Sequence, residues 1–82
     1  MRGVLLALLL LQATSLAAAE RVVSLAPSLS EIVLELGAAD LLVGVLDGGE
    51  RPQALAHVPS VGRYGQLEME TLLALQPDLL LL

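Results

Sequence analysis

Cysteine and lysine are both absent from this chain of 82 residues, which also has only one histidine and one aromatic residue. Without cysteine, no disulfide can strengthen a small core. Nine acidic residues against four arginines give a net charge of -5. That balance argues against nucleic-acid binding, in which basic surfaces provide most of the affinity. The side chains that remain offer few groups for catalysis.

Motifs for enzymatic chemistry are also missing. His57 lies among apolar residues, without a second histidine or an acid at metal-ligand spacing, so we expect a structural or surface role for it. The serines have no G-x-S-x-G context, and the glycines lack the spacings of phosphate-binding loops. We therefore predict no catalytic residue, no metal site and no cofactor. An α/β enzyme would need such motifs further along a longer chain.

Residues 1–19 have the pattern of a secretory signal peptide. Met1-Arg2 gives a positive start, Val4–Leu11 forms a short apolar core, and Ala17-Ala18-Ala19 supplies an A-x-A cleavage site. We expect cleavage between Ala19 and Glu20 and export to the periplasm. The alternative is an uncleaved membrane anchor, but the apolar core is shorter than the roughly 20 residues that span a bilayer. Because no cysteine stands at the cleavage site to carry a lipid, the mature chain is expected to be soluble.

A strand followed at once by a helix is the most informative local pattern. The apolar run Val22–Ala26 predicts a strand, and Ser28–Leu36 predicts a helix. Ser28 is a suitable N-cap with Glu31 three residues later, as in a capping box, and Gly37 can end the helix in the left-handed conformation. Such junctions bind small ligands in open α/β sheets, although a well-capped packing helix is the alternative. The predicted apolar face of the helix consists of Leu29, Ile32, Val33 and Leu36.

Strands and helices continue to alternate along the chain, which predicts an α/β fold with a parallel sheet built from βαβ units. Glu68–Gln76 predicts a helix. Leu79–Leu82 predicts a strand that is buried on both faces of the sheet. The apolar stripe of the later helix is expected to be Met69, Leu72 and Leu73. The other expected segments are a strand at Leu41–Leu46, a loop at Asp47–Gly49, a short helix at Pro52–His57 and a short strand or extended link at Val61–Gly62.

The apolar end of the chain indicates missing partners, because no helix follows Leu79–Leu82 to cover it. An α/β piece of about 63 residues without disulfides has a marginal core. We therefore expect the front part of a longer protein. A short product that folds poorly or pairs with another chain is the alternative.

Tyr64 and the acidic pair Glu68 and Glu70 are the exposed groups with the most evident binding chemistry. Tyr64 is flanked by Gly62 and Gly65, so its ring is expected on a loop. There it could either contact a ligand or cover apolar surface at a rim. The two glutamates suit the start of a helix, where negative charge complements the helix dipole. They could also contact a basic partner protein.

Two segments in order resemble one family. RVVSLAPSLSEIVLELGAADLLVGV resembles the opening of the class III periplasmic binding proteins, which serve ABC importers of vitamin B12, ferric siderophores and haem. VGRYGQLEMETLLALQPDLLLL is similar to that family's second recurrent segment. The likeness is greatest to the cobalamin-binding branch. It implies a non-enzymatic binding protein of two α/β lobes joined by a long helix, of which residues 20–82 would be the incomplete N-terminal lobe.

The same resemblance implies roles for single residues. Pro27 and Ser28 match the family's cleft-lining turn, and Tyr64 stands where cobalamin binders place an aromatic against the ligand. The loop that begins Asp47-Gly48 matches a cleft loop that usually carries an aromatic, and here Gly48 takes that place, which leaves ferric siderophore or haem open as ligands. Glu70 matches an acid that pairs with arginines of the membrane permease. The rival hypothesis is an exported interaction or structural fragment with no ligand.

Overall fold

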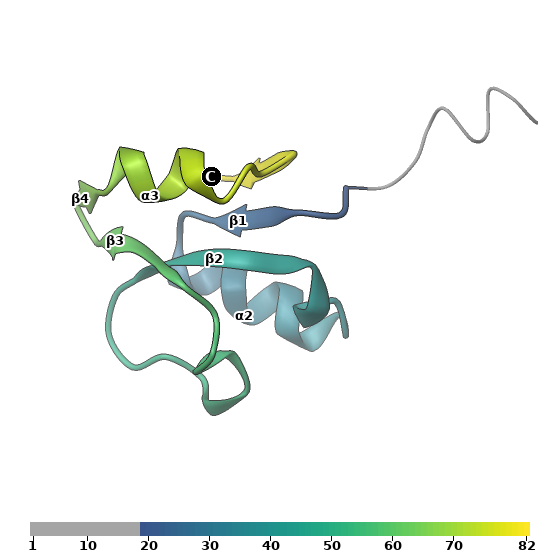
Figure 1. Ribbon diagram of the computed structural model, residues 1–82. Helices are drawn as coiled ribbons and strands as arrows, with labels where there is room; N and C mark the ends of the chain where they lie inside the picture. The colour runs from purple at the N-terminus through teal and green to yellow at the C-terminus, as the bar shows by residue number, and fades with distance from the viewer. Residues whose placement is uncertain (1–18) are drawn as a thin grey trace, which may run out of the picture.

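The computed structural model describes residues 19–82, so the predicted signal peptide lies outside the described part apart from Ala19. Five strands form one sheet in the order β4-β3-β2-β1-β5 (Figure 1). β1, β2, β3 and β5 are parallel, and β4 pairs antiparallel with β3 as a hairpin. The predicted α/β fold with parallel βαβ units is therefore confirmed. The strands are β1 (Val22–Ser24), β2 (Leu42–Asp47), β3 (Ser60–Arg63), β4 (Gln66–Leu67) and β5 (Leu79–Leu81).

Two α-helices cover opposite faces of this sheet (Figure 1). α2 (Pro27–Glu35) connects β1 to β2, and α3 (Met69–Ala74) connects β4 to β5. Two short 3₁₀ helices, η1 (Ala39–Leu41) and η2 (Gln53–Leu55), complete the connections. This arrangement gives three layers, with a hydrophobic core on each side of the sheet.

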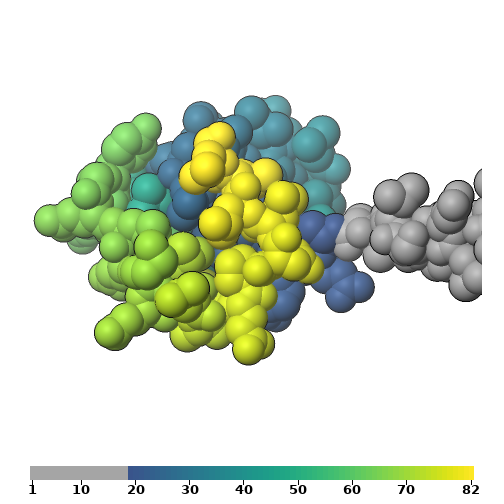
Figure 2. Space-filling model, turned by 90° about the horizontal axis from the view of Figure 1, so that it is seen from above, coloured from purple at the N-terminus to yellow at the C-terminus, as the bar shows by residue number. Residues whose placement is uncertain are grey.

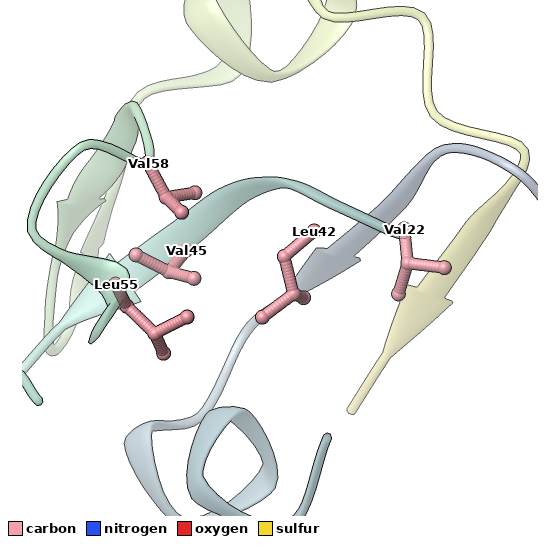
Figure 3. Packing of buried hydrophobic residues seen from close by; sticks show 5 residues of the cluster. All are labelled: Val22, Leu42, Val45, Leu55 and Val58. Carbon is pink, nitrogen blue, oxygen red and sulfur yellow. The ribbon is translucent and has the colours of Figure 1, made fainter. Parts of the chain in front are cut away.

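The larger core lies between the sheet, α2 and η2. Val33 and Leu34 of α2 pack against it, although both remain partly exposed. Leu55 is completely buried because η2 folds back onto β2 (Figure 3). Val22 of β1 and Leu42 and Val45 of β2 supply this side of the sheet. Leu42 and Val45 are three positions apart because the pairing of β1 with β2 shifts register after Val22. The buried members of this core are Val22, Leu42, Val45, Leu55 and Val58.

The smaller core lies on the other face, beneath α3. Val23, Val61 and Leu72 are its buried members, and Leu75 packs against them from just beyond the end of α3. Gly44 makes this close approach possible, because a Cβ atom there would lie 2.7 Å from Cδ1 of Leu75. The glycine within β2 is therefore a packing feature.

The start of α2 differs from the capping box that the sequence predicts. The helix begins at Pro27 with Ala26 as N-cap, and no side chain caps it. Proline is well suited to the first helical position, because its fixed φ is already helical and its missing N–H would have no partner there. Ser28 therefore lies inside the first turn and is exposed, and Glu31 is exposed too. The prediction of a Ser28 cap was wrong, whereas Gly37 does take a positive φ, of 74°, after the helix.

The buried side of α2 is also rotated from the predicted face. Ile32 is 50% exposed and Leu36 is 76% exposed. Ser30 is the buried residue of the helix, and its hydroxyl donates a hydrogen bond of 2.8 Å to Oγ of Ser24. Ser24 Oγ donates in turn to the carbonyl of Ala26. This buried polar pair fastens the helix to the end of β1, which apolar periodicity could not indicate.

The C-terminal elements are shorter and more exposed than predicted. In α3 only Leu72 of the expected stripe is buried, while Met69 and Leu73 are 54% and 66% exposed. β5 is an edge strand in which Leu79 and Leu80 are 43% and 41% exposed, and Leu81 packs on the larger core. The predicted strand is therefore present, but its leucines remain partly exposed within residues 19–82, where the covering helices that such a strand needs are not found.

Candidate functional site

Most of the predicted ligand residues lie where the parallel strands end. Pro27 follows β1 and starts α2, Asp47 is the last residue of β2, and Tyr64 follows β3. The backbone N–H of Tyr64 donates to the carbonyl of Asp47 over 2.8 Å, which holds the ends of β2 and β3 together. The edge of the sheet at the carboxyl ends of the strands, here called the carboxyl edge, is where ligands usually bind in open α/β folds.

An open hollow of about 380 Å³ lies at this edge. Asp47, Gly48 and Gly49 at the end of β2 line it together with Arg63 and Tyr64 at the end of β3. Its size is within the range of small-molecule sites. It combines an aromatic ring, a cation, a carboxylate and glycine backbone, so it offers both apolar contact and polar recognition.

Pro27 and Tyr64 both pack against Gly48. A Cβ atom on Gly48 would lie 2.7 Å from Cδ2 of Tyr64 and 3.1 Å from Cγ of Pro27. The ring of Tyr64 thus occupies the space that a side chain at position 48 would need. Tyr64 is nevertheless 73% exposed, so most of the ring is available for contact. The structure brings together three residues that the sequence suggested separately.

Asp47 is tied to Arg51 by a bidentate pair. Nε and Nη2 of Arg51 donate to Oδ1 and Oδ2 of Asp47, each over 2.9 Å. Nη1 of Arg51 donates to the carbonyl of Leu55 over 3.0 Å and also to the carbonyl of Val58. One arginine therefore braces the whole loop between β2 and β3. The sequence offered no signal for this role, because the partners of Arg51 lie in an irregular loop.

The charge of Asp47 is stabilised by its surroundings. The Ser60 hydroxyl nearby, and after it the Arg51 guanidinium, lowers the pKa of the Asp47 carboxyl below its ordinary value. Partial burial opposes this shift. Asp47 is consequently an anion at neutral pH whose oxygens already have partners. Its clearest contribution is to shape the loop that presents Gly48 and Gly49.

Ser28 and Glu70 lie apart from the lining of this hollow. Ser28 is exposed in the first turn of α2. Glu70 is exposed in the first turn of α3, on the face of the sheet opposite to α2. Arg63 is the lining residue that the sequence analysis did not select, since a lone arginine before a tyrosine has no distinctive pattern.

The described residues contain neither a cluster of metal ligands nor a membrane-spanning helix. In residues 19–82, no group of three or more histidines or acids is placed to hold a metal ion. In the same range, no helix is long and apolar enough to cross a membrane.

Known proteins are similar to this chain in sequence and in fold. A vitamin B12-binding protein of Vibrio vulnificus is 40% identical over 83 aligned positions, which cover 99% of this chain and 30% of the relative. The crystal structure of a periplasmic heme binding protein from Pseudomonas aeruginosa matches with a TM-score of 0.70 and 49% identity, over 77% of this chain and 23% of that one. The periplasmic vitamin B12 binding protein of Vibrio cholerae matches with a TM-score of 0.67 and 35% identity, over 76% and 24% respectively.

The chain thus spans about 30% of the length of the curated relative that it matches from end to end. A family model described as periplasmic binding protein matches residues 22–82, which include every strand and helix described above. The shared region contains the carboxyl edge with Pro27, Asp47, Gly48 and Tyr64. This chain belongs to the periplasmic binding protein family.

Proposed function

We propose that residues 20–82 are the incomplete N-terminal α/β lobe of a solute-binding protein that serves an ABC importer and binds cobalamin in the periplasm. In this proposal residues 1–19 direct export and are removed. The protein binds its ligand without catalysis and delivers it to the membrane permease. The observation that carries the proposal is the open hollow of about 380 Å³ at the carboxyl edge, with the exposed ring of Tyr64 on one wall.

Each wall of the hollow suits a bulky ligand with polar groups. The Tyr64 ring packs on Gly48, so it presents a flat apolar face with little freedom to collapse. The exposed Arg63 can pair with an anionic group, while the backbone at Gly48 and Gly49 allows close approach. Ser28 would contribute only if the ligand extends past Pro27 onto the start of α2.

The relatives support cobalamin as the ligand, because several of them, from Vibrio and Yersinia, are named vitamin B12-binding proteins. Haem is the second candidate. The heme binding protein of Pseudomonas aeruginosa shares 49% identity with this chain, against 35% for the vitamin B12 binding protein of Vibrio cholerae. The glycine at position 48, where an aromatic was expected, also leaves a ferric siderophore as an alternative.

Calorimetric titration of the full-length protein with cobalamin, haem and a ferric siderophore tests this proposal. Saturable one-to-one binding of cobalamin, with the other two at least tenfold weaker, is the expected result. Preferential binding of haem or of the siderophore would show that cobalamin is not the ligand, whereas the proposed role in an importer would stand. Binding of none of the three would favour an exported interaction or structural role.

A further inference from the structure

Asp78, just before β5, holds the start of the described chain. Its Oδ2 accepts a hydrogen bond from the backbone nitrogen of Glu20, and its Oδ1 accepts one from that of Arg21, each over 3.0 Å. Its own N–H donates to the carbonyl of Arg21 over 2.9 Å. Figure 2 shows the yellow C-terminal residues lying against the dark blue residues at the start of the described part of the chain. The backbone nitrogen of Glu20 is therefore held on a carboxylate.

The side chain of Arg21 strengthens the same junction from the other side. Its Nη2 and Nε donate to the carbonyl of Leu75 over 2.7 and 3.0 Å, and Nε also approaches the carbonyl of Gln76. These carbonyls follow α3, where the end of a helix leaves acceptors without intrahelical donors. Because Arg21 is anchored in this way, the preceding nitrogen of Glu20 is kept close to Asp78.

We propose that removal of residues 1–19 converts the Glu20 nitrogen into an α-ammonium that forms an ion pair with Asp78, so that maturation itself fastens β1 to β5. Hydrolysis breaks the Ala19–Glu20 peptide bond with one water. The water oxygen and one hydrogen join the Ala19 carbonyl carbon, and the other hydrogen joins the Glu20 nitrogen. The new carboxyl proton then passes to the amine at neutral pH. This inference rests on the export step of the proposed function.

The local charges favour this pair. Within residues 19–82, the charged groups at the junction are the Glu20 carboxylate, Arg21 and Asp78. Backbone donation from Glu20 and then from Arg21 lowers the pKa of Asp78, so its carboxylate is an anion at neutral pH. The neutral amide of the precursor supplies one uncharged donor, whereas the ammonium supplies a charge-assisted hydrogen bond. Asp78 is exposed, so solvent and salt will keep the gain modest.

The sign of the pH dependence follows from the amine. An α-amino group normally titrates near about 7.7–8.0, and a neighbouring carboxylate raises that value in the folded protein. A raised pKa of this kind contributes stability that is complete below the unfolded value and is lost as the pH rises through the folded value. The mature protein should therefore lose this contribution between about pH 8 and pH 10.

Four full-length proteins test the inference. Two start at Glu20 and two retain Ala17–Ala19, which keeps an amide at Glu20 and moves the ammonium away; each has either Asp78 or D78N. At pH 7, D78N should lower the thermal midpoint by about 1–3 °C more in the protein that starts at Glu20 than in the protein that retains Ala17–Ala19. At pH 10 the two losses should be equal. An equal loss in both pairs at pH 7 would overturn the ion pair.

Two further measurements cover the other outcomes. If D78N does not fold, the two proteins with Asp78 still test the inference. The difference between their thermal midpoints should shrink from pH 7 to pH 10. A difference that does not change with pH would contradict the inference. Mass spectrometry of the secreted protein must also find Glu20 at the amino terminus. A different start would overturn the maturation step without affecting ligand binding, which the calorimetric titration measures separately.

Discussion

At the scale of single residues, Tyr64 is the proposed aromatic contact for the ligand, and its ring lines the hollow. Truncating it to alanine should weaken binding by roughly 1–3 kcal/mol, the range for losing the burial of one large apolar side chain. Tyr64→Trp keeps a flat ring and should be tolerated. Titration calorimetry of the full-length protein, with whichever of the three ligands binds, measures both effects.

Met69→Ala is the matched control for Tyr64, because Met69 is also a large exposed residue, at 54%, and does not line the hollow. It should leave the dissociation constant unchanged. If Tyr64→Ala behaves like this control, Tyr64 belongs to the rim and the ligand lies elsewhere.

Asp47 and Arg51 should make the loop between β2 and β3 sensitive to acid. The lowered pKa of Asp47 means that its contribution to stability is present above the unfolded pKa of about 3.9 and is lost as the pH falls through the folded value. Asp47→Asn should therefore cost about 1 kcal/mol at pH 7, a modest value because the pair is partly exposed. It should cost almost nothing near pH 2.

Chemical denaturation at both pH values measures this difference. Arg51→Ala should cost more than Asp47→Asn at pH 7, about 1–3 kcal/mol, because two backbone carbonyls also lose their donor. A cost of Asp47→Asn that does not change with pH would mean that the charge of Asp47 is not what braces the loop.

At the scale of elements, the β3–β4 hairpin depends on Gly62. Its φ is +123°, and a Cβ atom there would lie 2.1 Å from the backbone oxygen of Gln66. Gly62→Ala should therefore lower the free energy of unfolding by about 2–4 kcal/mol, since it adds a clash with backbone to an unfavourable dihedral. Denaturant unfolding of the full-length protein measures the change.

Gly65 in the same hairpin separates these two causes. Its φ is also positive, at +82°, but a Cβ atom there would meet no atom within 4 Å. Gly65→Ala should cost only the dihedral strain, about 1 kcal/mol. Equal costs at the two positions would show that the hairpin shifts to relieve the clash at Gly62.

At the scale of the whole molecule, Glu70 is proposed to contact basic residues of the permease. In cells that depend on this importer, Glu70→Ala should slow uptake roughly three- to tenfold while ligand affinity stays the same, as expected for a lost surface charge pair. Glu35→Ala, an exposed acid on α2, is the matched control and should change neither property. Equal losses of uptake and affinity would assign Glu70 to the ligand site.

The larger architecture could be predicted because it depends on patterns that are local in the sequence. Apolar runs separated by helical segments indicate parallel strands with crossovers. Apart from Arg21, both segments that carry the family resemblance lie within residues 22–82, which the family model matches. Tyr64 between two glycines likewise indicated an exposed ring on a loop, and the structure has it 73% exposed. Element boundaries were less accurate, as Pro27 rather than Ser28 begins α2.

Tertiary structure alone decided the contacts that join residues far apart in the chain. The sequence predicted alternating strands and helices, but the stacking of Tyr64 on Gly48 and the fastening of Glu20 and Arg21 by Asp78 arise only when distant strand ends meet. The buried sides of α2 and α3 also depended on tertiary structure, because packing against the sheet determined which of their apolar residues were buried. Periodicity reports how often a helix turns, whereas the sheet that it meets determines which side faces inward.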